Sequence, residues 1–179
     1  MLRRRRPEDP LAQVSPSSVS PRFRGAVAAA LDARRRYADL VAGMRDGPSR
    51  DRLAALQAQV DSAVLAAWDT ARRAGDIERT LATLDPDRVT AEYKQARRTS
   101  GDDDLEAALA QRFASVQRLL NTLDDTDERL QLLDARLGAA VAAAVEVAIG
   151  TAQPDQVGAE LESVVGDLEA LRSALHDLG

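Results

Sequence analysis

Apolar residues recur at three- and four-residue spacing along most of the chain, which is the period of an amphipathic helix. Proline, glycine and capping residues divide this pattern into five segments. We predict four long helices and a short one, the third: 21–46, 49–84, 86–96, a fourth from the loop 99–104 to 150, and a fifth from near Thr151 or Pro154 to 178. The pattern therefore predicts an all-α protein.

The predicted helices need partners, because helix propensity alone does not hold such segments in water. Short connections make successive helices antiparallel. We therefore expect an elongated antiparallel helical bundle or coiled coil of four main helices, with the short helix at a corner. The fourth helix is the longest, so the first and fifth are expected to lie end to end along it. Part of its apolar stripe would then be left for a second copy or a partner helix.

Residues 1–20 break this pattern, because they hold four Arg, several Pro and a Ser cluster without an apolar period. We predict a disordered basic arm over 1–20 and a single helical domain over 21–179. The net charge is +4 over residues 1–24 and −5 over residues 151–179. The arm is either a solvated tail or an electrostatic contact for an anionic membrane or an acidic protein. The residues that would make this contact are Arg3, Arg4, Arg5 and Arg6.

The composition supports the helical prediction and narrows the choice of partners. Of 179 residues, 34 are Ala and 23 are Leu, so runs of strand-forming residues are missing. The net charge of −5 argues against nucleic acid. The most apolar run, 138–150, contains Glu146 and is too short to span a membrane. We expect a cytoplasmic protein, peripheral to a membrane at most. The ratio of 23 Arg to one Lys is typical of a GC-rich bacterial genome.

The sequence contains no recognisable pattern of catalytic or ligand-binding residues. It has no Cys, one His and one Lys. Zinc and di-iron sites need several Cys or His ligands, and a phosphate-binding loop needs Lys after a glycine-rich turn. We therefore expect no metal, no cofactor and no enzymatic activity. His176, in the last turn of the fifth predicted helix, is interpreted as a cation favoured at a helix C-terminus.

The fifth predicted helix has the most regular heptad pattern, and the Ala-rich end of the fourth allows close helix approach. Together they supply a candidate helix–helix interface: Val141, Val145, Val157, Leu161, Val164, Leu168, Leu171 and Leu175. We predict a non-enzymatic coiled-coil interaction or scaffold protein that forms a homodimer and binds a helical protein partner. The alternative is a peripheral membrane scaffold that uses the Arg-rich arm.

Overall fold

The computed structural model describes residues 11–99 and 103–176, apart from the side chains of Leu168, Arg172 and His176. Two short 3-10 helices, η1 (Pro16–Ser18) and η2 (Pro21–Phe23), precede five α-helices. These are α1 (Arg24–Gly43), α2 (Pro48–Leu84), α3 (Pro86–Thr99), α4 (Asp103–Ala148) and α5 (Pro154–His176). No strand occurs within the described ranges, and the all-α prediction is confirmed.

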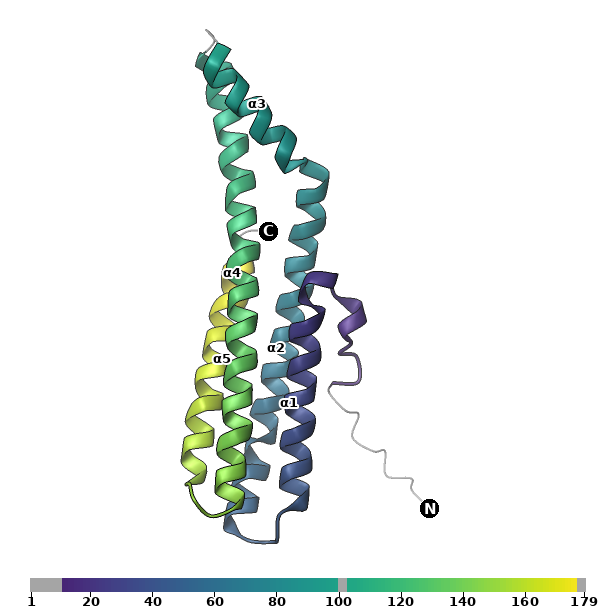
Figure 1. Cartoon of the computed structure of the whole chain (residues 1–179), viewed down its shortest axis with the longest axis vertical. Coiled ribbons are helices and arrows are strands. Elements are labelled where there is room, and N and C mark those ends of the chain that lie inside the picture. The colour runs from purple at the N-terminus through teal and green to yellow at the C-terminus, as the bar shows by residue number, and fades with distance from the viewer. Residues whose placement is uncertain (1–10, 100–102, 177–179) are drawn as a thin grey trace.

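The molecule is elongated, and its helices follow the long axis or lie at a small angle to it (Figure 1). In that view α1 descends to the lower end, α2 returns past it, and α3 continues at an angle to the upper end. α4 then runs the whole length downwards, and α5 climbs back to about the middle. α2 and α4 are in contact, α1 and α5 each pack against both of them, and α3 packs on the start of α4.

α1 and α5 are placed along α4 differently from the sequence prediction. Arg136 of α4 pairs with Asp167 of α5, while the neighbouring Asp134 shares a surface hollow with Asp32 of α1. Both helices therefore cover the same stretch of α4 instead of lying end to end. The reason is that the two short connections, after α1 and before α5, both lie at the lower end in Figure 1.

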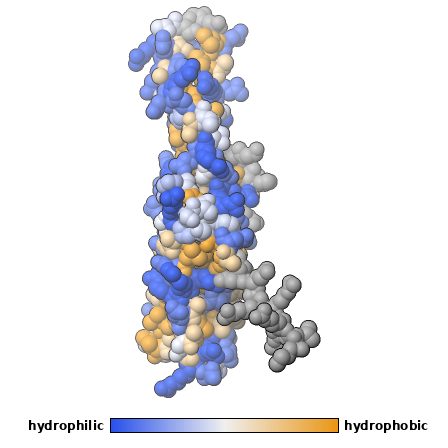
Figure 2. Space-filling view, turned by 90° about the vertical axis from the view of Figure 1, so that its right-hand side faces the viewer, coloured by the Kyte–Doolittle hydropathy of each residue, from blue (hydrophilic) through white to orange (hydrophobic). Residues whose placement is uncertain are grey.

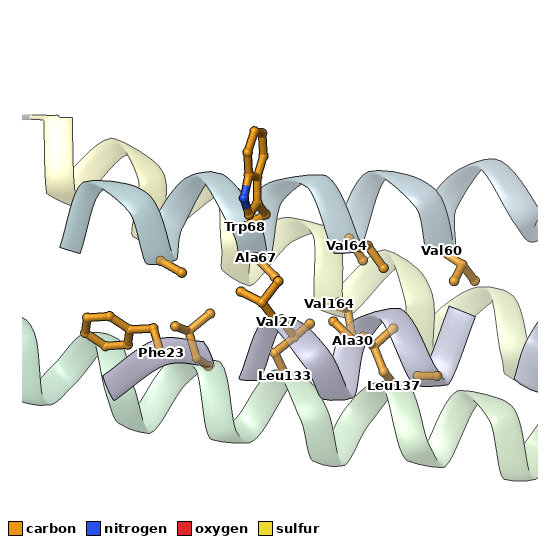
Figure 3. Packing of buried hydrophobic residues seen from close by; sticks show 14 of the residues in the cluster. Phe23, Val27, Ala30, Val60, Val64, Ala67, Trp68, Leu133, Leu137 and Val164 are labelled. Carbon is orange, nitrogen blue, oxygen red and sulfur yellow. The ribbon is translucent and has the colours of Figure 1, made fainter. Parts of the chain in front are cut away.

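Small aliphatic side chains dominate the core where these four helices meet. α2 turns alanines inwards at three- and four-residue spacing: Ala63, Ala67, Ala71 and Ala74. Larger side chains from the other helices pack against this surface. Figure 3 shows Val27 of α1, Leu133 of α4 and Val164 of α5 converging near Ala67. Small residues on one helix let a neighbouring helix axis come close.

Residues 11–20 differ from the disordered arm expected there. Leu11 and Val19 are buried, and the indole N–H of Trp68 donates a hydrogen bond to Ser18 Oγ at 2.8 Å. In Figure 3 the indole of Trp68, itself a buried residue of the core cluster, points from α2 away from the other labelled residues, and the segment covers it. The same segment also lies against α1. Ser20 lies directly over Gly75 of α2, where a β-carbon would be in van der Waals contact with Ser20 Cβ at 3.5 Å. The few apolar residues of the segment have no regular spacing, which is why the pattern missed their burial.

α2 and α3 are joined by the single residue Asp85, whose backbone is left-handed with φ of 51°. Its carbonyl accepts the Val89 N–H at 3.0 Å, and its carboxylate accepts the Arg88 N–H at 3.2 Å. Asp85 is therefore the N-cap of α3. The turn directs α3 onto α4, where Tyr93 stacks on Phe113 with ring centroids 4.8 Å apart.

Arginine–carboxylate pairs connect elements that lie side by side. Arg22 of η2 donates to Asp124 of α4 at 2.8 Å, at a point where four acidic residues between 124 and 128 interrupt the apolar pattern of α4. α4 continues through this region as one helix. Further pairs of this kind are Arg34–Asp61 at 2.7 Å, Arg52–Asp155 at 3.2 Å and Arg112–Glu92 at 3.1 Å. Such exposed or half-exposed pairs contribute about 0–1 kcal/mol each.

Tyr37 of α1 is fully buried, and its hydroxyl donates a hydrogen bond to the Leu53 carbonyl of α2 at 2.9 Å. Burial raises the pKa of Tyr37 from 10.0 to about 12, because the low-dielectric core disfavours the phenolate. The bond and the burial together hold α1 to the first turns of α2.

The fluorescence of the single tryptophan provides a test of this packed N-terminal segment. We expect Val19→Asp to release the segment, because a charge at this buried position is strongly disfavoured. Trp68 emission should shift to longer wavelength while far-UV circular dichroism changes little, since α1–α5 remain. Gln13→Asp, at an exposed position of the same segment, is the matched control. Unchanged Trp68 emission in Val19→Asp would contradict the packing.

Tyr37 predicts how stability depends on alkaline pH. Its pKa is higher in the folded chain, so its contribution is complete below pH 10 and is lost as pH rises through about 12. Over that interval the free energy of unfolding should fall by about 1.4 kcal/mol per pH unit from this group. Tyr37→Phe should be about 1 kcal/mol less stable at neutral pH and lack this slope. Chemical denaturation at several pH values between 9 and 12 measures both, and identical slopes would show that Tyr37 does not titrate as expected.

Candidate functional site

Titratable groups do not gather into a polar centre in the part of the chain that is described. Within 11–99 and 103–176, no group of three or more His, Asp and Glu residues is placed to hold a metal ion. The pKa of Arg88 is raised by its hydrogen bond to the Glu92 carboxylate, but this pair lies on the exposed side of α3. No helix of the same ranges is long and apolar enough to cross a bilayer. The features suited to binding are apolar surfaces on α4.

Most of the predicted interface residues lie inside the chain's own core. Val157, Leu161, Val164, Leu171 and Leu175 of α5 are at most 5% exposed. α5 packs against α2 and α4, so its heptad surface is used within the chain. These five residues are therefore not available to a second copy while the chain keeps this fold.

The remaining predicted site residues have different environments. Val141 of α4 is half-buried against the core, whereas Val145 is 41% exposed. The side chain of Leu168 and the arm residues Arg3, Arg4, Arg5 and Arg6 lie outside the described part of the structure. Val145 is thus the predicted interface residue that the structure places on a surface open to another protein.

A second apolar stripe runs along the solvent-facing side of α4, opposite the side that enters the core. We call these residues the outer stripe: Leu132, Ala135, Ala139, Ala142, Val145 and Ile149. All six are exposed, and Ile149 and Leu132 are 70% and 47% exposed. Glu146 is the charged residue within the stripe. The stripe covers 17 helical steps, or about 25 Å.

The outer stripe differs from the solvent-facing sides of the neighbouring helices. Exposed positions of α1 and α2 are rich in charge: Asp32, Arg35, Arg36, Asp39, Arg72, Arg73, Asp76 and Arg79. Figure 2 shows the molecule from the right-hand side of Figure 1, where hydrophilic residues cover most of the surface between smaller apolar patches. Charged outer faces are typical of water-exposed helices. Three successive exposed alanines between large aliphatic residues are unusual on such a face.

A groove of about 360 Å³ lies beside the outer stripe, between α4 and α5. Apolar side chains form most of its lining: Leu132, Leu133, Val164, Ala170 and Leu171. Arg129, Arg136 and Asp167 contribute its polar edge. Arg136 donates to Ser163 Oγ at 3.0 Å and pairs with Asp167, which fixes its guanidinium at this edge. The groove can accept an aliphatic side chain and has two arginines at its margin.

The sequence pattern missed Leu132, Ala135 and Ile149 as surface residues. Apolar residues occupy nearly all sides of α4 over 138–150, so the sequence alone does not tell which side enters the core. The sequence offers one indication of this surface, which is the near-absence of charged residues. On the side of α4 opposite Leu133 and Leu137, they are nearly absent for about five turns.

Comparisons with known proteins do not assign this surface. No protein-family model, no curated protein and no solved structure matches the chain. The geometry of α4 and its neighbours is therefore the basis for proposing a function.

Proposed function

We propose that the protein is a non-enzymatic helical interaction or scaffold protein that self-associates and binds a helical partner through the outer stripe of α4. The observation that carries the proposal is the outer stripe, whose six exposed residues between Leu132 and Ile149 are all apolar. Contiguous exposed apolar patches on soluble proteins mark interaction surfaces.

The shape of the outer stripe suits a helix better than a flat surface or a loop. Ala135, Ala139 and Ala142 form a smooth central strip, which allows a second helix axis to approach closely. Leu132 and Ile149 stand at its two ends and supply most of the apolar area. A helix with apolar residues at matching three- and four-residue spacing would bury all of them.

The proposed interface lies on α4, whereas the sequence predicted an interface formed mainly by α5. The heptad of α5 is occupied within the chain, whereas the Ala-rich end of α4 faces solvent on one side. Association through α4 leaves the core intact, so it requires no unfolding of α5. This geometry supports a scaffold role, because an elongated molecule with an apolar stripe along its side can bind other helical proteins lengthwise.

The proposal predicts that charge in the middle of the outer stripe abolishes association. We expect Ala139→Glu with Ala142→Glu to prevent self-association and partner binding in analytical ultracentrifugation and pull-down experiments, because the charges would be buried at the contact. The free energy of unfolding should change by less than about 0.5 kcal/mol, as both positions are exposed.

Ala55→Glu with Ala58→Glu on α2 is the matched control, with the same spacing and exposure. It should associate like the unmodified chain. If the α4 double variant associates as strongly as this control, the outer stripe is not the interface.

The membrane-scaffold alternative depends on Arg3, Arg4, Arg5 and Arg6 and is tested by flotation with acidic and neutral vesicles. It expects binding to acidic vesicles alone, loss of binding in high salt, and loss after removal of residues 2–10. The deletion stops before Leu11, because Leu11 and Val19 are buried against the helices. Binding that is independent of salt and of the arm would contradict the alternative.

A further inference from the structure

Ile149 projects from one end of the outer stripe, and the α4–α5 groove lies beside Leu132 at its other end. Ile149 is the most exposed large apolar residue of the described part of the chain, and the lining of the groove is mostly apolar. They are about 25 Å apart along α4. In a two-fold dimer, the projection of each copy can fill the recess of the other, so the same contact forms twice.

Antiparallel pairing brings these two features together. If two copies of α4 run in opposite directions and cross between Ala139 and Ala142, positions equally far from the centre face each other. Ile149 of one copy then lies at the level of Leu132 of the other, next to the groove. The same operation places the second Ile149 at the first groove, so both projections are buried at once.

Charge distinguishes the antiparallel from the parallel arrangement. Glu146 lies within the outer stripe, and Arg136 lies at the edge of the groove. In the antiparallel pair, Glu146 of one copy lies at the level of Arg136 of the other, so opposite charges meet. In a parallel pair in register, Glu146 would face Glu146, which is repulsive. The surface is therefore complementary to itself only when the two helices run in opposite directions.

The centre of the stripe has the small residues that such a crossing needs. Ala139 and Ala142 are exposed, and no atom of the chain would lie within 4 Å of a β-carbon at Gly138. Two helix backbones can therefore approach closely at this point without displacing a side chain.

We infer that the outer stripe binds a second copy of this chain in an antiparallel two-fold dimer, with Ile149 of each copy in the α4–α5 groove of the other. The inference rests on the proposed function and adds the orientation of the two copies and the contact of Ile149 with the groove. A contact about 25 Å long and one helix wide buries on the order of 800 Å² in total, which is the size of a weak, transient interface. The dimer should therefore be concentration-dependent.

Thiol cross-linking tests the orientation, because the chain contains no cysteine of its own. In the antiparallel dimer Ala142→Cys should cross-link to itself with a short bismaleimide, since its two copies lie about 5 Å apart along the helices. Ala135→Cys and Val145→Cys should each fail to cross-link alone, because each is more than about 12 Å from its own copy. A mixture of these two variants should cross-link, since 135 and 145 face each other. Efficient cross-linking of Ala135→Cys with itself would show a parallel dimer and overturn the inference.

A substitution at the projection tests the groove contact. Ile149→Ser should weaken dimerisation by roughly tenfold or more in sedimentation velocity, because it removes the anchor from both grooves. Leu105→Ser is the matched control, as it changes another exposed aliphatic residue of α4, about 40 Å before Leu132 at the start of the stripe. Equal dimerisation of the two variants would overturn the groove contact.

The outcomes also separate this inference from the proposed function. A chain that dimerises through Ala139 and Ala142 but in parallel orientation, or without Ile149, would overturn this inference and leave the proposed function standing. A chain that dimerises even with Glu at both positions would overturn both.

Discussion

Close contact between α2 and α4 is the constraint on which the rest of the molecule depends. α2 offers this contact through alanines such as Ala67 and Ala71, which add little bulk between the two helix axes. With these two helices close together, α1 and α5 occupy the two remaining sides, each against both. The apolar stripes of all four helices are then buried within one chain. The aromatic residues Tyr37 and Trp68 then attach further elements to α2, because Tyr37 of α1 donates to the Leu53 carbonyl and Trp68 donates to Ser18 of the N-terminal segment.

The helices could be predicted from the sequence because their ends are marked by local chemistry. Pro48, Pro86 and Pro154 each stand at the first position of an observed helix, where a missing N–H costs nothing. Residues 11–20 could not be predicted in the same way. Their burial depends on contacts with Trp68 and its neighbours, which lie far along the chain on α2. Periodicity detects a repeated pattern within one segment, and this segment has none.

The surface that we propose for association was harder to predict than the fold. A heptad such as that of α5 shows which side of a helix is buried. The pattern is the same whether the helix that covers it belongs to the same chain or to another. For this reason Leu161 and Val164 resembled an interface and proved to be core. On α4 the difficulty was the opposite, because apolar residues on nearly all sides hid the division between the core side and the side of Ile149. Only the placement of α1 and α5 makes that division visible.

The turn at Asp85 has a consequence for how this molecule can vary in length. One left-handed residue joins two helices, and α3 then packs in register on α4 through Tyr93 and Phe113. Inserting a single residue into α3 would rotate everything beyond it by about 100° and turn Tyr93 away from its partner. A matched insertion of about seven residues in both α3 and the start of α4 would instead restore the same facing sides two turns further out. The upper end of the molecule can therefore be lengthened or shortened only in steps of whole heptads, taken in the two helices together.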